Sequence, residues 1–343
     1  MHYLFEPRMN INKHVYSLII IRVYLYVFVI LKYLITLLQG RHILIIFLLL
    51  IETTVSAQQF SAEKAIDHIR ELLLLGPRVT GYSGHYNARK LIINVLKKNN
   101  NNISEQCFNY HSESKKKYQF CNIIARFSPE NQQRIVLGTH YDSKQFDDQS
   151  KNVKSQLVVP GANDSASGVA LLLVMSEILR NISVEIGLGI DLVFFDGEEG
   201  VQHGENDVWF PIGSSYFVSN IDMYFQQKPL LVIVFDMICD KNLQIYQEKS
   251  SLDNSFTWVE KFWYSAEKLG YTSFIKQHKM RIFDDHSPFI LNNIPAFLVI
   301  DYDYKFWHTY QDTLDKCSQK SLEEVGNTLI YFLKNLTASI ELK

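Results

Sequence analysis

Cysteine is scarce in this 343-residue chain, and neither sign of charge is in excess. The chain contains four cysteines and no Cys-x-x-Cys pair, so the sequence does not predict a zinc site built from cysteine. The formal net charge is −2, and no basic block is longer than the three lysines at 115–117, which argues against a nucleic-acid-binding protein. Internal repeats, low-complexity tracts and linkers are also missing, so nothing marks a second folded domain.

Hydrophobic residues are plentiful, at 47% of the chain, which argues against disorder. Near the N-terminus they form two apolar blocks, at 15–38 and 43–51, and Arg22 interrupts the first block. A basic pair precedes the second block and small residues ending at Ala57 follow it, which is the order of a secretory signal cleaved after Ala57. The second block is too short to span a bilayer.

We therefore expect residues 1–57 to be a signal peptide or a membrane anchor, and residues 58–343 to be a single catalytic domain. Cleavage is the favoured alternative, and a buried core helix is the least favoured. The catalytic domain would then enter the secretory pathway and be either secreted or tethered to a membrane on the luminal or extracellular side.

Four asparagines begin Asn-x-Ser/Thr triplets, the acceptor pattern for N-glycosylation. We expect Asn102, Asn181 and Asn335 to lie on loops or at the ends of elements, where a glycan can attach. Asn163 lies between two apolar segments, and we expect it to be buried and unmodified.

Cys107 and Cys121 flank a polar turn at 111–117 that separates two strand-like runs. On such a hairpin the two residues can face each other and form a disulfide in an oxidising compartment. Two free, buried thiols are an equally open alternative.

The rest of the domain alternates apolar, β-branched runs with helical patterns. Near-continuous apolar strands of this kind are buried on both faces, which is typical of a parallel sheet. The sequence therefore predicts an α/β fold with a mostly parallel central sheet and helices on both faces. We expect a hairpin at 103–127, strands at 134–139, 191–196, 229–236 and 294–300, and helices from Ser61 to Gly76 and at 83–98, 165–180, 255–269 and 321–336.

The stretch 161–168 lies between the strand at 134–139 and the long apolar run 169–179. Asp164 is thus expected on a loop at a helix start, where the helix dipole favours a carboxylate. Strand-loop-helix edges are where α/β folds place their chemistry. We predict that Asp164 binds a metal ion together with Glu199 and His308.

Acidic and histidine residues follow several of the predicted strands directly. Because the carboxyl ends of parallel strands meet at one edge of a sheet, we expect these side chains to converge. Taken singly, an Asp at a helix start is usually a cap, a Glu pair is usually solvated, and a Trp-His pair is usually packing. Together they favour a catalytic zinc site, which uses three protein ligands and one open position. The residues are His140 and Asp142, Glu198 and Glu199, Asp236, Asp284 to His286, and Trp307 and His308.

Five motifs resemble those of the glutaminyl-peptide cyclotransferases, or glutaminyl cyclases, which share a fold with the zinc aminopeptidases. The resemblance covers residues 60–338. The motifs are Gly-Thr-His-Tyr-Asp at 138–142, Gly-Ala-Asn-Asp-Ser at 161–165, Phe-Asp-Gly-Glu-Glu at 195–199, Asp-Asp-His-Ser-Pro-Phe at 284–289 and Trp-His-Thr at 307–309.

The resemblance implies a role for each residue of the site. Asp164, Glu199 and His308 would hold one zinc ion per chain, and Glu198 would be the general acid and base. Asp284 and Asp236 would share a hydrogen-bond network with Glu198 and raise its pKa by like-charge crowding. Trp307, Trp209 and His140 would contact the substrate, although Trp209 lies a few residues beyond the place where the cyclases usually carry a tryptophan.

The implied reaction converts the amino-terminal glutamine of a peptide to pyroglutamate and releases ammonia. The main rival is a di-zinc aminopeptidase, in which the residues matching His140 and Asp236 hold a second metal. Asp284, where the peptidases usually carry serine, and Trp307 favour the cyclase. A binding ectodomain with a dead site is less favoured, because none of the proposed catalytic residues is missing. The peptides processed and the oligomeric state stay open.

Overall fold

The computed structural model describes residues 24–32, 59–100, 102–112, 115–149, 157–200 and 210–336. The chain divides into two compact units, Met1–Ala57 and Gln58–Lys343. Of the first unit only residues 24–32 are described, and they form a helix. The second apolar block and the expected cleavage position after Ala57 lie outside the described residues. Among those that are described, no helix has the length and hydropathy needed to cross a membrane.

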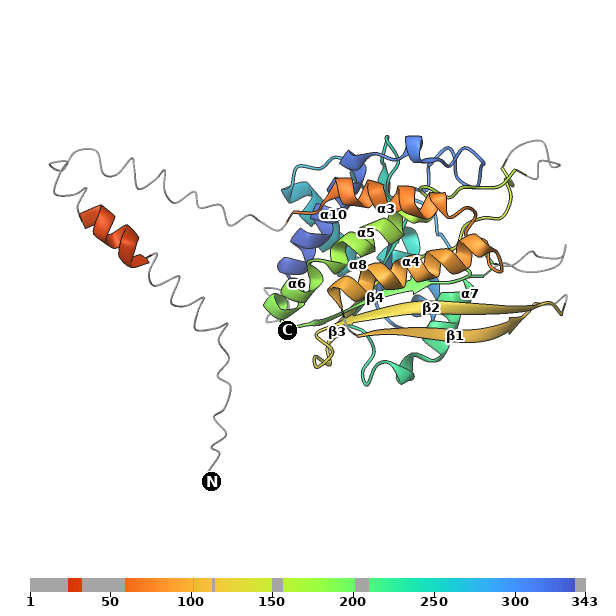
Figure 1. Cartoon of the computed structure of the whole chain (residues 1–343), viewed down its shortest axis with the longest axis horizontal. Helices are drawn as coiled ribbons and strands as arrows, with labels where there is room; N and C mark the ends of the chain where they lie inside the picture. The colour runs from red at the N-terminus through yellow and green to blue at the C-terminus, as the bar shows by residue number, and fades with distance from the viewer. Residues whose placement is uncertain are drawn as a thin grey trace, which may run out of the picture. The chain divides into compact units, whose positions relative to one another are not determined.

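The second unit alternates helices and strands, as the sequence predicts (Figure 1). Its α-helices are α3 (Ala62–Leu74), α4 (Ser83–Asn99), α5 (Ala166–Ser176), α6 (Leu179–Ile186), α7 (Ile212–Ser219), α8 (Lys249–Lys268), α9 (Ser287–Leu291) and α10 (Gln319–Lys334). Its strands are β1 (Ile103–His111), β2 (Lys117–Phe127), β3 (Arg134–His140), β4 (Gly189–Phe195), β5 (Leu231–Asp236), β6 (Ile245–Gln247), β7 (Phe274–His278) and β8 (Ala296–Ile300).

Six strands form the central sheet in the order β1-β2-β4-β3-β5-β8. The strands β4, β3, β5 and β8 run parallel to one another, while β2 is antiparallel to both β4 and β1. The predicted mostly parallel α/β sheet is therefore confirmed. Because β3 lies between β4 and β5, the residues that follow these three strands meet at one edge of the sheet.

Helices cover both faces of this sheet. One face packs against α3, α4, α5, α6, α8 and α10, in a core that includes Ile69, Ile92 and Phe262. The other face packs against α7 and α9 through Phe217 and Phe289. Both faces are apolar because successive strand side chains point to opposite sides and both sides are buried.

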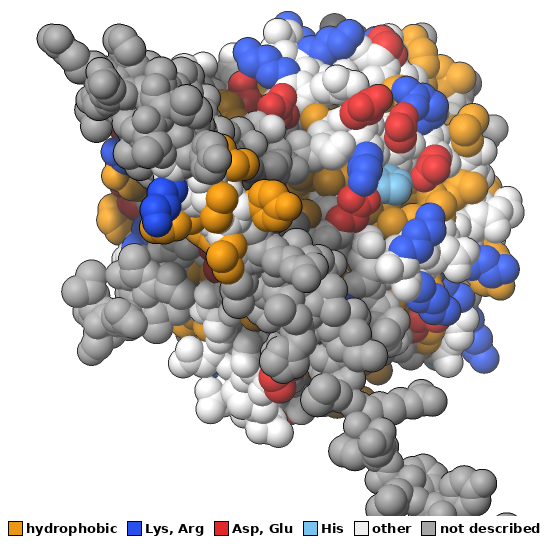
Figure 2. Space-filling model, turned by 60° about the vertical axis from the view of Figure 1, so that its left-hand side comes forward, with side chains coloured by type: hydrophobic (Ala, Val, Ile, Leu, Met, Phe, Trp, Pro, Cys, Tyr) orange, Lys and Arg blue, Asp and Glu red, His pale blue; other side chains and the backbone are white. Residues whose placement is uncertain are grey.

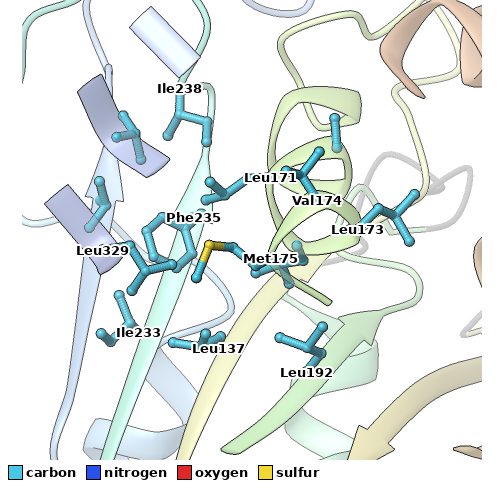
Figure 3. Close-up of a cluster of buried hydrophobic side chains, with 14 of the residues drawn as sticks. Leu137, Leu171, Leu173, Val174, Met175, Leu192, Ile233, Phe235, Ile238 and Leu329 are labelled. Atoms are coloured by element: carbon cyan, nitrogen blue, oxygen red, sulfur yellow. The ribbon is translucent and has the colours of Figure 1, made fainter. Parts of the chain in front are cut away.

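The helix α5, which follows the stretch 161–165, lies at the centre of the larger core. All of its residues are buried, so it is apolar on every side rather than amphipathic. Figure 3 shows Leu171 and Met175 of α5 beside Leu137 of β3 and Phe235 of β5. Packing on all sides of α5 thereby fixes the helix that begins two residues after Asp164.

Two predicted helices differ from those observed. The helix expected at 165–180 is two helices, because α5 ends at Ser176 and the amphipathic α6 follows; no Gly or Pro marks the break. As a result Asn181 lies within α6 rather than on a loop, and its side chain is exposed. The helix expected at 255–269 begins earlier, at Lys249, and the expected start coincides with a non-helical backbone at Ser255.

Two disulfides are present among the described residues. The hairpin β1–β2 places Cys107 opposite Cys121, and the two form the disulfide that the sequence left open. A second disulfide joins Cys239 to Cys317, 78 residues further along the chain, and the sequence did not predict it. It ties the segment after β5 to the segment before α10.

Two of the three asparagines expected to carry glycans lie where the sequence predicts. Asn102 and Asn335 lie at the ends of elements and are exposed. Asn163 is fully buried, and its side-chain oxygen accepts a hydrogen bond from the N–H of Cys239 at 2.8 Å. On the face drawn in Figure 2, basic and acidic side chains of the described residues lie interspersed.

Candidate functional site

The chemistry-bearing side chains meet at the carboxyl edge of the parallel strands. His140 ends β3, Asp236 ends β5, and Glu198 and Glu199 follow the end of β4 after two residues. The register of the sheet pairs His140 with Phe195, so the end of β3 is level with the end of β4. The convergence predicted from the sequence is therefore present in the structure.

At this edge of the sheet, two groups of three described side chains are close enough to hold a metal ion. Asp164, Glu199 and His308 offer ligand atoms within 4.8 Å of one another, and so do His140, Asp164 and Asp236. Asp164 belongs to both groups. The Nε2 atom of His308 lies 3.3 Å from Glu199 Oε2 and 3.6 Å from Asp164 Oδ2. On the other side, His140 Nε2 lies 3.3 Å from Asp164 Oδ1 and 3.3 Å from Asp236 Oδ1.

Polar contacts from buried side chains hold the loop that carries Asp164. The carboxylate of Asp312 accepts hydrogen bonds from the N–H groups of Asn163 and Asp164, at 2.9 and 3.1 Å. The fully buried guanidinium of Arg78 donates to the carbonyl oxygens of Pro160 and Gly161. Gly161 has a φ of +70°, and a Cβ there would lie 2.4 Å from the carbonyl oxygen of Asp164. Glycine is therefore required at this position.

The Glu198–Glu199 pair is placed by the turn after β4. Gly197 adopts a φ of +74°, which a glycine accommodates without strain. The carboxylate of Asp142 then accepts both backbone N–H groups that follow, from Glu198 at 3.2 Å and from Glu199 at 3.0 Å. One buried carboxylate at the end of β3 thus fixes the backbone of both glutamates at the end of β4.

The ring of His308 is oriented on its other side by Asp148. His308 Nδ1 lies 3.1 Å from Asp148 Oδ2, and the backbone N–H of Asp148 donates to the carbonyl oxygen of His308 at 3.3 Å. The ring of Trp307 lies against that of His308, with 4.1 Å between the centroids. A carboxylate behind a histidine favours the tautomer that presents Nε2 to a metal ion.

A cavity of about 350 Å³ opens above these groups. Charged and apolar side chains both line it, so the cavity offers both ligand atoms and a surface for an aliphatic chain. Its lining consists of Lys144, Asp148, Asp164, Glu198, Glu199, Asp236, Met237, Arg281, Ile282, Phe283, Asp284, Ile300, Tyr302, Trp307 and His308.

The pKa values of two carboxyl groups in this cavity are raised. Burial has the largest effect on the pKa of Glu198 and raises it well above its ordinary value. The charge of His140 opposes this rise, and the charge of Asp284 adds to it. Like-charge crowding, which we predicted as the cause, is therefore the smaller contribution. Burial and the charge of Asp236 raise the pKa of Asp284 to about 6. Glu198 and Asp284 can thus hold a proton near neutral pH.

The ligand atoms themselves favour a cation at this place. Burial and the charges of Glu199 and Asp236 raise the pKa of Asp164 to about 7. Oxygen Oε1 of Glu199 is buried and has no hydrogen-bond partner among the described residues. A buried carboxylate oxygen without a partner is costly, and coordination of a cation would satisfy it.

The sequence-predicted site residues do not all line the cavity. Trp307, Glu198, Asp236 and Asp284 do so, together with the three expected ligands. The ring of His140 is 1% exposed and lies outside the lining, where it contacts Asp142, Asp164 and Asp236. Trp209 lies outside the described residues.

Several residues that hold the site in place were not predicted from the sequence. Asp148 orients His308, Asp312 holds the loop of Asp164, and Lys144 Nζ lies 3.3 Å from Glu199 Oε2. Lys144 and Asp148 could have been predicted from their position shortly after β3, because residues near the end of that strand were already expected at the site. The sequence offered no such signal for Asp312.

Comparison with known proteins gives a consistent result. Residues 122–333 match Peptidase family M28. The chain is 25% identical over 308 residues to the glutaminyl-peptide cyclotransferase of Drosophila melanogaster, covering 80% of this chain and 82% of the fly protein.

Solved structures with the same fold include both cyclases and peptidases. The glutaminyl cyclase of Porphyromonas gingivalis has a TM-score of 0.75 and 30% identity, covering 81% of this chain and 99% of the bacterial chain. A Zn-dependent exopeptidase from Parabacteroides distasonis has a TM-score of 0.75 and 28% identity, with the same coverage. The architecture predicted from the sequence is thus shared with zinc exopeptidases.

Proposed function

The chain belongs to peptidase family M28, and from that premise we propose that its site converts the amino-terminal glutamine of peptides to pyroglutamate with release of ammonia. The observation that carries the proposal is that Glu198 and Asp284, both with raised pKa values, face the Asp164–Glu199–His308 group in one cavity. The similarity to the fly cyclotransferase and the Porphyromonas gingivalis glutaminyl cyclase supports this activity.

Zinc is the metal that fits this site. Two carboxylates and one imidazole are typical zinc ligands, and three protein ligands leave a coordination position open for a substrate. We propose that Asp164, Glu199 and His308 hold one zinc ion per chain. When bound there, zinc supplies Lewis-acid polarisation of the γ-carbonyl oxygen of the glutamine.

The side chains of this protein manage the protons of the reaction. A carboxylate oxygen of Glu198 takes a proton from the α-amino group, whose nitrogen then forms a bond to the γ-carbon of the same residue. Glu198 next returns the proton to the amide nitrogen, the carbon–nitrogen bond of the amide breaks, and ammonia leaves. No water is consumed. The charge of Asp284 helps to keep the pKa of Glu198 in the range where Glu198 can both accept and release a proton.

Other residues hold the substrate or its binding groups in place. Trp307, beside His308, supplies a flat apolar wall for the methylene groups of the glutamine. His140 lies behind the carboxylates, so we propose that it orients Asp164 and Asp236 in place of the direct substrate contact expected from the sequence.

The rival activity is hydrolysis of amino-terminal residues by a di-zinc site. The His140–Asp164–Asp236 group has the spacing for a second ion, so the ligand set alone does not distinguish the two. The deciding experiment presents the purified enzyme with a glutaminyl peptide and a leucine anilide side by side. Ammonia release without anilide cleavage supports the cyclase, whereas anilide cleavage with two zinc ions per chain supports the peptidase.

We also propose that the catalytic domain, residues 58–343, works in the secretory pathway, either secreted or tethered on the luminal side by the N-terminal segment. Two disulfides and three exposed Asn-x-Ser/Thr acceptor asparagines support an oxidising, glycosylating compartment. Mass spectrometry of the protein from a eukaryotic secretory host tests the proposal: an N-terminus at Gln58 and glycans at Asn102, Asn181 or Asn335 are expected.

A further inference from the structure

The carboxylate of Glu248 is a buried group outside the cavity that the proposed reaction does not use. It lies between β6 and α8 and is 2% exposed. Four hydrogen-bond donors converge on its two oxygens, and the ring of His286 lies close to one of them. Oε1 accepts from the N–H groups of Ser250 at 2.7 Å and Ile282 at 3.0 Å, and Oε2 accepts from Ser251 N–H and Oγ–H at 2.6 and 2.7 Å and lies 3.3 Å from His286 Nε2.

Two of these contacts bracket the catalytic segment. Ile282 lies two residues before Asp284 and His286 lies two residues after it, and Glu248 contacts both. The segment between them forms part of the cavity wall through Ile282, Phe283 and Asp284. A single carboxylate therefore clamps the segment of Asp284 on both sides, through the backbone N–H of Ile282 and the ring of His286.

The anchor of this clamp is itself rigid. Glu248 is the N-cap of α8, where a negative charge is favoured by the helix dipole and accepts the free N–H groups of the first turn. The hydroxyl of Ser251, which donates to Glu248, also accepts the N–H of Leu298 in β8 at 3.0 Å. Glu248 thus connects the segment of Asp284 to the start of α8 and to the edge strand of the sheet.

The ionised form of Glu248 suits this arrangement. Burial raises the pKa of Glu248, but the nearby charge of His286 and the hydrogen bonds from Ser250 and Ser251 outweigh burial and lower the pKa to about 2. Since the carboxylate accepts all four of its hydrogen bonds, an amide at this place would set an NH₂ group against N–H or O–H donors.

We propose that Glu248 is a positioning residue for the cyclisation, which holds Asp284 in the cavity where it keeps Glu198 able to accept and return its proton. The proposal rests on the proposed function, because it gives Asp284 its role in the Glu198 network. A shift of about 1 Å in a catalytic group costs up to a hundredfold in rate. We expect the loss in kcat, with the zinc ligands untouched.

The test compares Glu248→Gln with Glu260→Gln in the zinc-loaded, full enzyme. Glu260 lies within α8 and pairs with Gln247 and Lys276 rather than with the segment of Asp284, so it is the matched control. Glu248→Gln is expected to lower kcat at least tenfold, to shift the pH profile of kcat, and to keep zinc content at the wild-type value. Glu260→Gln is expected to leave all three unchanged.

A purely structural role would lower the fraction of folded enzyme and scale kcat down without moving the pH profile. A folded Glu248→Gln enzyme with wild-type kcat and pH profile overturns the proposal. If Glu248→Gln does not fold, His286→Gln removes one side of the clamp and leaves the cap of α8 intact, and a wild-type pH profile in that variant overturns the proposal. Absence of cyclisation in the wild-type enzyme would instead contradict the proposed function.

Discussion

The carboxylate of Asp312 accepts a hydrogen bond from the backbone N–H of Asp164 at 3.1 Å, although 148 residues separate the two. The same carboxylate accepts the N–H of Asn163 and the hydroxyl of Tyr304. Asp312 is fully buried, so it fixes the loop of an expected zinc ligand without facing the cavity itself.

We expect Asp312→Asn to weaken zinc binding by about 10- to 100-fold, the range typical of residues that orient metal ligands. Its amide would present hydrogens to N–H donors that now meet an oxygen. The measurement is competition for zinc against a chelator of known affinity. Asp315→Asn, in the same segment but on the surface beside Lys316, is the control and is expected to keep wild-type affinity.

Glu198→Gln is expected to fold, to keep its zinc, and to lose about 10²- to 10⁴-fold in kcat, the contribution of a general acid–base group. The amide cannot take the proton of the α-amino group. Ammonia release and zinc content are measured on the same preparation. Near-normal turnover would show that another residue is the base.

His308→Ala is expected to lower bound zinc, because it removes the only imidazole of the Asp164–Glu199–His308 group. Elemental analysis after dialysis against metal-free buffer measures the loss. The matched control is His278→Ala, which changes an exposed histidine at the end of β7. Undiminished zinc in His308→Ala would take His308 out of the ligand set.

Loss of the Cys239–Cys317 disulfide is expected to destabilise the protein more than loss of Cys107–Cys121. The bridges close segments of 78 and 14 residues, so the chain-entropy relation gives about 4.5 and about 3 kcal/mol. Each pair is replaced by serine, and the free energy of unfolding is measured in urea on metal-free protein. Equal losses for the two pairs would contradict the chain-entropy argument.

The stability contributed by Glu248 is expected to depend on pH. Its pKa in the folded protein is about 2, below the ordinary 4.5, so the contribution is complete above pH 4.5 and is lost as the pH falls toward 2. The difference of about 2.5 pKa units corresponds to about 3 kcal/mol. The free energy of unfolding in urea is measured for the metal-free wild type and Glu248→Gln at pH 6 and pH 2.5. If the difference between the two proteins is not smaller at pH 2.5, the assignment is contradicted.

The central part of the site could be predicted from local pattern. Buried apolar runs alternate with helical segments, and that alternation determines a parallel sheet whose carboxyl ends share an edge. Residues at the ends of those runs or shortly after them, such as His140, Glu199 and Asp236, must then meet there. The sequence by itself determined the fold class, the convergence of these side chains and the resemblance of the motifs.

The supporting contacts were decided only by the tertiary structure. Asp312 meets Asp164, Glu248 meets Ile282 and Cys239 meets Cys317 across 148, 34 and 78 residues. A hydrogen bond or a disulfide between distant segments requires no repeating spacing along the chain, so it leaves no local pattern to find. Periodicity records which face of an element is buried, whereas the partner of each buried polar group is chosen by the packing of whole elements against one another.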